Sequence, residues 1–256
     1  RTNLIKRAAK PLFAVFQLKF AIITPALITG GVAERIRFSS LMVFIVFFSI
    51  FIYAPLAHWT WHPEGFLRKW GVLDFAGGTV VHISAGFAAL SGAIFLKKRK
   101  DGGTDNPTNI PYILLGTGLL WFGWFGFNAG SALAANELAV KAFLNTNLAS
   151  ATAMVTWMLT DGARGKKRSV VGAAVGAVVG LVAITPSAGF VTVGQSIFIG
   201  CTASLVSYFA TRLKSRSSID DTLDVFPCHG IGGITGMILT GVFAENVGLI
   251  YGDPTV

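Results

Sequence analysis

The sequence predicts an all-α polytopic membrane protein. Hydrophobic residues make up 53% of the 256 residues and charged residues only 13%, whereas roughly 25% of the residues of a soluble protein are charged. The mean hydropathy is +0.64. The charges are also segregated, because Asp, Glu, Lys and Arg are absent from 38–63, 75–96, 107–136, 142–160, 169–211 and 225–244. A helix needs roughly 20 apolar residues to cross a bilayer, so these stretches predict transmembrane helices.

Eight spans are expected. In chain order they cover about 11–33, 40–57, 75–96, 111–131, 138–160, 170–185, 189–211 and 226–245. Spans two, three, four and eight lie almost entirely within one charge-free stretch each. Span one contains a single charge, Lys19, which either extends to the membrane surface or faces a lumen. Span five carries Lys141 near its start. The longest stretch is broken by Thr185-Pro186-Ser187-Ala188-Gly189 and gives spans six and seven.

The basic residues indicate the orientation of the spans. Thirteen of the 21 Lys and Arg residues form four clusters, which are Arg35/Arg37, Lys97-Lys98-Arg99-Lys100, Arg164/Lys166/Lys167/Arg168 and Arg212/Lys214/Arg216. The clusters follow spans one, three, five and seven, so they lie on one side of the membrane. The positive-inside rule makes that side the cytoplasm. We therefore interpret the net charge of +9 as a topology signal and expect no nucleic-acid partner.

Two histidines lie inside apolar spans, each shortly after an aspartate. His82 follows Asp74, and His229 follows Asp224. An ionisable side chain is costly in hydrocarbon and usually has a function there, although a lone histidine is often a structural residue. Two such residues in similar settings predict a polar path through the protein.

The two histidine segments also suggest an internal repeat. The first ends a run of three spans and the second ends a run of five. If two further spans precede residue 1, each half holds five spans, and the odd number inverts one half relative to the other. Inverted repeats with the site at their interface are a common plan among membrane proteins that move solutes.

Several of the 30 glycines are spaced by four residues. They are Gly172, Gly176 and Gly180; Gly126 and Gly130; and Gly232 and Gly236. Small residues allow close helix packing in lipid, so we expect a tightly crossed bundle.

Five segments resemble the ammonium transporter family (Amt/Mep/Rh). They are FAIITP (20–25), AERIRFS (33–39), DFAGGTVVH (74–82), WFGWFGFNAGS (121–131) and DVFPCHG (224–230). The resemblance runs from about residue 12 to 250. It implies one membrane domain over 1–256, with a first-repeat part of about 1–100 and a second-repeat part of about 101–250 around a central pore. The eight spans would be the third to tenth of eleven helices, and the short loops favour a bacterial Amt-type member.

The resemblance implies a role for several residues. Phe20 and Phe127 correspond to stacked phenylalanines that close the outer end of the pore. Trp61, with Phe20 and the hydroxyl of Ser131, corresponds to an outer ammonium site. Tryptophan is common near the membrane surface, so an interfacial belt is the alternative interpretation of Trp61. Trp59 competes with Trp61 for the role, because the spacing to Asp74 in this loop can differ among relatives.

The remaining roles concern the aspartates and the histidines. Asp74 corresponds to the acidic residue beneath the outer site, and His82 and His229 correspond to twin histidines that line the pore. A carboxylate at a helix start accepts backbone N–H bonds. We therefore expect Asp74 to be chiefly structural, with cation attraction as an added effect, and Asp224 to do the same at the start of the last span.

The chemistry of a small cation is consistent with these roles. Aromatic faces attract a cation, and a serine oxygen accepts an N–H bond, which potassium ion cannot donate. A dry lumen makes it costly to carry an intact charge. Loss of a proton from ammonium avoids much of that cost, and two neutral imidazoles, which both donate and accept, form a proton relay. We expect separated passage of ammonia and a proton.

Two other functions compete with transport. The first is an ammonium sensor, in which a transporter-like domain is fused to a signalling module. The second is a gas channel, in which a neutral pore recruits no cation. No enzymatic constellation, cofactor motif or metal site is expected. His58 and His62 lie near Glu64 but lack further ligands. The resemblance implies a homotrimer in the inner (plasma) membrane, in contact with lipid, with ammonium as substrate and a cytoplasmic regulatory protein or fused domain as a further partner.

Overall fold

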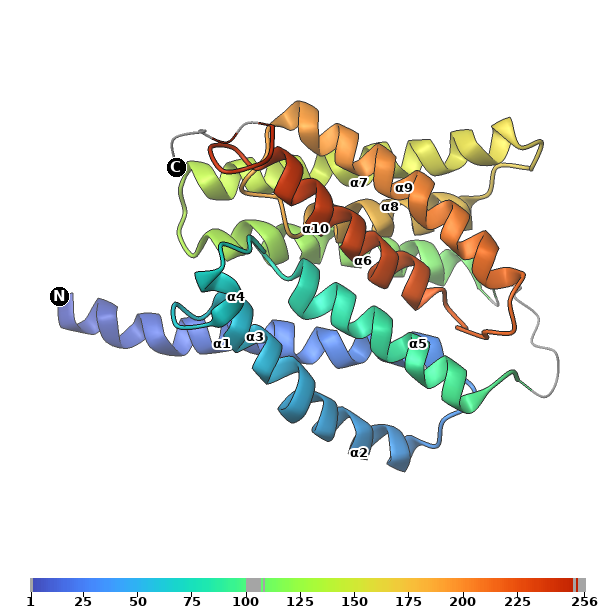
Figure 1. Cartoon of the computed structure of the whole chain (residues 1–256), viewed down its shortest axis with the longest axis horizontal. Helices are drawn as coiled ribbons and strands as arrows, with labels where there is room; N and C mark the ends of the chain where they lie inside the picture. The colour runs from blue at the N-terminus through green and yellow to red at the C-terminus, as the bar shows by residue number, and fades with distance from the viewer. Residues whose placement is uncertain (1, 100–106, 108, 251, 253–256) are drawn as a thin grey trace.

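The computed structural model describes residues 2–99, 107, 109–250 and 252, with side chains from residue 10 onward (Figure 1). Regular structure in these residues is helical, apart from one isolated bridge between Asn246 and Gly252. The α-helices are α1 (Thr2–Val32), α2 (Phe38–Phe48), α3 (Ala54–Trp61), α4 (Phe66–Lys69), α5 (Ser84–Leu96), α6 (Ile110–Ala129), α7 (Glu137–Ala163), α8 (Val170–Ile184), α9 (Val193–Ser215) and α10 (Gly232–Phe243). Three π-helical segments, η1 (Ser49–Tyr53), η2 (Gly78–Ile83) and η4 (Phe226–Ile231), and the 3-10 turn η3 (Gly130–Ala132) complete them.

The helices confirm the predicted membrane architecture. Over the described residues, eight helical rods coincide with the eight expected spans, because α2, η1 and α3 form one rod, η2 continues into α5 and η4 continues into α10. The ends agree within a few residues except at the first span, which was expected from about residue 11, whereas α1 begins at Thr2. Six of these rods are long and apolar enough to cross a membrane. Helices α7 and α8 occupy the two remaining positions. The chain is therefore a multi-pass membrane protein.

The outward connection after the second span begins later than expected. The second span was expected to end at about residue 57, but α3 continues to Trp61. The physical reason is that the four residues from His58 to Trp61 contain no helix breaker, and the first proline is Pro63. Trp61 consequently has a fixed place on a helix.

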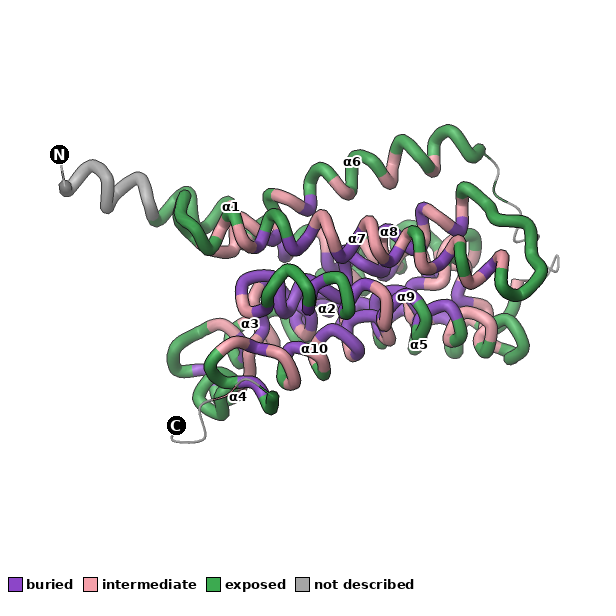
Figure 2. Tube along the Cα trace, turned by 90° about the horizontal axis from the view of Figure 1, so that it is seen from above, coloured by how far each residue is buried: buried purple, intermediate pink, exposed green. Residues whose placement is uncertain are grey.

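Glycines bring the helices of the second half into close contact. A Cβ atom on Gly176 would stand 2.7 Å from Trp157 Cβ, and one on Gly180 would stand 2.4 Å from the carbonyl oxygen of Ala149. This confirms the expected close packing at these two glycines and shows that α7 is the partner of α8. Gly126 is an exception, since no atom of the described chain lies within 4 Å of its would-be Cβ. Figure 2 shows buried residues concentrated where α7, α8, α9 and α10 meet, whereas α6 is exposed along much of its length.

The two rods that carry the histidines cross at a pair of glycines. A Cβ atom on Gly86 would stand 2.3 Å from the backbone nitrogen of Gly230. The rods also run in opposite directions, as Figure 1 shows for α5 and α10. This antiparallel crossing is the relationship that the inverted repeat predicts.

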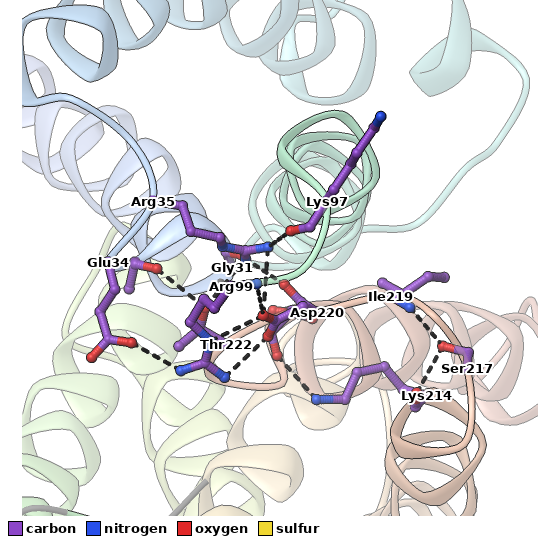
Figure 3. Close-up of polar contacts among 12 residues, drawn as sticks. Gly31, Glu34, Arg35, Lys97, Arg99, Lys214, Ser217, Ile219, Asp220 and Thr222 are labelled. Carbon is purple, nitrogen blue, oxygen red and sulfur yellow. Dashed lines mark hydrogen bonds and ion pairs between the residues drawn. The ribbon is translucent and has the colours of Figure 1, made fainter. Parts of the chain in front are cut away.

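The connections that carry the basic clusters lie together at one end of the bundle, at the right of Figure 1. Lys100 lies outside the described residues. Three of these connections are joined by ion pairs and hydrogen bonds (Figure 3). Arg99 bonds to both carboxylate oxygens of Asp220 at 3.0 and 3.1 Å and to Glu34 at 2.9 Å. The side chain of Arg35 donates to the carbonyl oxygens of Lys97 and Asp220.

This cluster goes beyond our interpretation of the basic residues as topology signals. Burial alone would raise the pKa of Asp220, but the hydrogen bonds from Arg99 and the charges of Arg35 and Arg99 outweigh it and hold the pKa below its ordinary value. The same bonds raise the pKa of the Arg99 guanidinium. Arg35 and Arg99 therefore also fasten the connections at this end of the two halves to each other.

Candidate functional site

The two histidines meet in the interior of the bundle. His82 lies on η2 and is 0% exposed, and His229 lies on η4 and is 7% exposed. Their Nδ1 atoms are 3.3 Å apart, and their ring centroids are 5.3 Å apart with 34° between the planes. Both stand on π-helical turns, which occur often at functional sites. The two halves of the chain thus contribute one imidazole each to a single buried pair.

Asp74 holds the start of the first histidine helix. Its carboxylate accepts hydrogen bonds from the backbone N–H groups of Gly77, Gly78 and Thr79 at 2.8, 2.6 and 2.8 Å. Burial raises the pKa of the Asp74 carboxyl, and these N–H groups oppose the rise. Gly77 has φ of 114°, which favours glycine. These contacts support a structural role for Asp74 ahead of direct contact with a cation.

The corresponding carboxylate of the second half is Asp221, which our sequence reasoning missed. It accepts bonds from the N–H groups of Val225 and Phe226 at 3.1 and 2.7 Å. Burial raises the pKa of Asp221, and these donors oppose the rise. Asp224 lies at the same helix start, with φ of 56°, and its carboxylate pairs with Lys214 at 2.7 Å.

A row of aromatic rings leads to the histidine pair. The Trp61 ring lies 5.6 Å from Phe20, Phe20 lies 4.5 Å from Phe127, and Phe127 lies 6.0 Å from His82, all between centroids. Trp61 is fixed further by a 3.0 Å hydrogen bond from its indole nitrogen to the carbonyl oxygen of Asp74. Trp59 packs instead on Phe66 at 5.2 Å and is 39% exposed. Of the two tryptophans, only Trp61 joins this row.

Ser131 lies in the 3-10 turn η3, directly after the helix that carries Phe127. Its hydroxyl donates to the carbonyl oxygen of Phe127 at 2.8 Å. Because the hydroxyl has one proton, its oxygen remains an acceptor for a further N–H group. The side chain is partly exposed.

Thr185 and Trp124 are further members of the site that sequence reasoning missed. The Thr185 oxygen lies 3.4 Å from His82 Nε2 and accepts a 2.9 Å bond from the Trp124 indole. The Trp124 ring also stacks on His82, with centroids 5.3 Å apart and 15° between planes. We had interpreted Thr185 only as the start of a break between spans. The one sequence signal that pointed to Thr185 as a site residue was its position as a polar side chain within the longest charge-free stretch.

An apolar hollow lies apart from the histidine pair. It has a volume of about 810 Å³ between α1, α2 and α5, and its lining includes Phe44, Phe48 and Phe87 but neither histidine. The candidate site itself consists of the aromatic row and the imidazole pair. Together they place cation-attracting rings in front of two groups that donate and accept protons.

Comparison with known proteins identifies relatives over nearly the whole chain. The model of the Ammonium Transporter Family matches residues 3–254. The chain is 54% identical over 246 residues to an ammonium transporter of Aquifex aeolicus, with 94% of this chain covered. It is 48% identical over 253 residues to an ammonium transporter of Bacillus subtilis, with 96% of this chain covered.

Solved structures show the same similarity. Candida albicans Mep2 matches with a TM-score of 0.87 and 43% identity over 92% of this chain and 53% of the Mep2 chain. A structure described as a sensor Amt protein matches with a TM-score of 0.83 and 34% identity over 90% of this chain and 60% of that one. The chain spans 58% and 62% of the Aquifex and Bacillus relatives. With its helices, its buried histidine pair and these relatives all in agreement, the chain belongs to the ammonium transporter family.

Proposed function

We propose that this chain forms the pore-bearing part of a protein that transports ammonium or ammonia across a membrane. The observation that carries the proposal is the unbroken row of rings from Trp61 through Phe20 and Phe127 to the buried pair of His82 and His229. The names of the relatives, which are ammonium transporters, support the choice of solute.

Trp61, Phe20 and Ser131 recruit the cation. An aromatic face contributes about 0.5–2 kcal/mol to the binding of a cation, and the Ser131 oxygen accepts an N–H group. Phe20 and Phe127, whose centroids are 4.5 Å apart, close the entry behind this site. Asp74 holds Trp61 and η2 in place through its carbonyl and carboxylate oxygens and adds negative charge beneath the entry.

Beyond the phenylalanines the solute loses its water. An unpaired charge is very costly to bury, so ammonium gives up a proton and passes as ammonia. The proton follows the imidazole pair, which is joined by a contact of 3.3 Å. A neutral imidazole carries both a donor and an acceptor, and the two rings therefore relay a proton beside the path of ammonia.

The whole protein acts as a homotrimer in the inner (plasma) membrane, with a cytoplasmic regulatory protein or fused domain as a partner. The four basic connections at one end of the bundle support the assignment of that end to the cytoplasm. The second candidate function is an ammonium sensor, which the similarity to the sensor Amt structure favours.

Current on a solid-supported membrane distinguishes the two. The full-length protein is reconstituted in liposomes and exposed to a pulse of ammonium, with potassium as the control cation. A sustained, saturable current that potassium does not elicit supports transport. A brief binding transient, or ammonium binding without current, supports the sensor.

A further inference from the structure

We infer that Thr185 is a positioning residue that fixes which nitrogen of each histidine carries the proton. This deepens the proposed function, because it identifies the one nitrogen of the pair that is free to take a proton. The contacts that carry the inference involve Thr185, Leu181, Trp124 and the two histidines.

The Thr185 hydroxyl has a single proton, and its acceptor is the carbonyl oxygen of Leu181. Thr185 ends α8, and its backbone N–H bonds to the carbonyl oxygen of Val182, one residue short of the regular helical partner. The hydroxyl donates to the carbonyl oxygen of Leu181 at 2.7 Å. Leu181 and Thr185 are both 0% exposed, so that carbonyl has no access to water. The hydroxyl proton is therefore committed to Leu181.

The same oxygen has two lone pairs, and each faces a ring N–H group. The Trp124 indole only donates, and it occupies one lone pair at 2.9 Å. The other lone pair faces His82 Nε2 at 3.4 Å. Since the oxygen accepts in both contacts, His82 Nε2 carries a proton. The opposite arrangement would exchange a 2.7 Å bond to a buried carbonyl for a 3.4 Å bond.

The tautomer of His82 determines the tautomer of His229. A neutral ring protonated on Nε2 has a bare Nδ1. His229 Nδ1 lies 3.3 Å from His82 Nδ1, so His229 donates and is the Nδ1–H tautomer. Among the described residues, these contacts leave one acceptor of the pair unused, namely Nε2 of His229. Trp124 also stacks on His82 at 15°, which restrains rotation of the ring away from Thr185.

The pair therefore takes a proton at one atom. When ammonium gives up a proton, its N–H bond breaks, the electron pair stays on the nitrogen of ammonia, and the new N–H bond forms at His229 Nε2. The Nδ1–H of His229 then shifts to the bare Nδ1 of His82, and His229 becomes neutral again. His82 then holds the charge as an imidazolium, with Nε2–H still donated to Thr185 and Nδ1–H donated to His229.

Histidine tautomers are measurable by magic-angle-spinning NMR, because protonated and bare ring nitrogens differ in ¹⁵N shift. We would label the full-length protein with ¹³C,¹⁵N-histidine in lipid bilayers at neutral pH and assign the pair by its Nδ1–Nδ1 proximity. In the unsubstituted protein we expect one set of signals, with Nε2–H on His82 and Nδ1–H on His229. In Thr185→Val we expect a second set of signals, with Nδ1–H on His82 and Nε2–H on His229. The fraction of protein with this reversed pair should rise about fivefold to tenfold, as the loss of one hydrogen bond allows.

Two variants separate this role from a general loss of stability. Thr185→Ser retains the hydroxyl and should keep the single set. Thr240→Val removes another buried hydroxyl, which bonds to Gly236 at 2.8 Å, and should leave the signals unchanged. If Thr185→Val does not insert, Thr185→Ala replaces it. A mixed or reversed pattern in the unsubstituted protein, or one set in Thr185→Val or its replacement, would overturn the inference.

The experiment is independent of transport. Absence of a sustained ammonium current in the unsubstituted protein counts against the proposed function and leaves the tautomer assignment standing. A normal current with an unchanged tautomer pattern in Thr185→Val counts against Thr185 and leaves transport standing.

Discussion

Asp74 and Asp221 hold the two histidine helices in the same way, and each lies eight residues before its histidine. Asp74 accepts three backbone N–H bonds at the start of η2, and Asp221 accepts two at the start of η4. The rods that they begin run in opposite directions. The equivalent carboxylates of the two halves are thus Asp74 and Asp221, with Asp224 beside the second.

Removal of the Asp221 carboxylate should destabilise the last span. Loss of an acceptor at a helix start costs about 0.5–2 kcal/mol, so we expect Asp221→Ala to lower the midpoint of thermal unfolding in detergent. Asp221→Asn retains one oxygen and should lose less. Glu64→Gln is the control, because the Glu64 side chain is 70% exposed and its ion pair with Lys69 lies at the surface. Equal midpoints for Asp221→Ala and this control would refute the capping role.

The stabilising effect of Asp220 should depend on pH. Its pKa is lower in the folded protein than in the unfolded chain, so the ionised form stabilises the fold. This contribution is complete above the ordinary carboxyl pKa of about 4 and is lost as pH falls below it. Asp220→Asn should therefore unfold at a lower temperature than the unsubstituted protein at pH 7, and the gap should narrow below about pH 4. A gap that stays constant with pH would contradict the ion-pair explanation.

Replacement of both histidines by alanine should abolish the relay. We expect His82→Ala/His229→Ala to reduce the sustained ammonium current at least about tenfold, the scale of catalysis by a positioned proton acceptor being 100-fold or more. His58→Gln/His62→Gln is the matched control, because these histidines lie on α3 and in the connection after it. Unchanged current and ammonium selectivity in the first double variant would rule out the relay.

Gly86 should tolerate no side chain. Its would-be Cβ lies 2.3 Å from the backbone of Gly230, so Gly86→Ala forces the histidine rods apart. Overpacking costs about 1–3 kcal/mol, and we expect a lower unfolding midpoint together with reduced current. At Gly118 no described atom lies within 4 Å, so Gly118→Ala should be neutral or slightly stabilising. Indistinguishable midpoints for the two variants would mean that the crossing is looser than the structure indicates.

The two tryptophans of α3 should differ in their effect on ammonium affinity. Trp61 contacts Phe20, whereas Trp59 contacts Phe66. Trp61→Leu should raise the ammonium concentration for half-maximal current about 2- to 30-fold, which corresponds to about 0.5–2 kcal/mol of cation–π attraction. Trp59→Leu should leave it unchanged. A larger effect at Trp59 would transfer the recruiting role to that residue.

The spans were predictable because charged residues are costly in hydrocarbon, so helices that cross a membrane appear in the sequence as long stretches without charge. The gathering of the basic clusters at one end of the bundle was predictable too, because the clusters follow alternate spans. The partners of those charges were not, since Arg35 and Asp220 are 185 residues apart and only the folded chain brings them together. The roles of Arg35 and Arg99 in joining the two halves therefore emerged from the structure.

The site was predictable in its residue types and less so in its supporting contacts. His82, His229, Phe20, Phe127 and Trp61 lie in one row, and their roles in transport stay predictions. Asp221 was missed because Asp224 is nearer to His229, although the spacing of eight residues pointed to Asp221. Thr185 and Trp124 were missed because hydrogen bonds between spans leave no local pattern.

The contact between His82 and His229 also has a consequence for biosynthesis. The two residues are separated by 147 positions, and a ribosome that adds about 5–20 residues per second needs about 7–30 s to travel from one to the other. During that interval His82 has no imidazole partner, and a proton wire cannot exist. The proposed relay can form only when the last described span docks, so we expect that a half-made chain in the membrane does not conduct protons by this route.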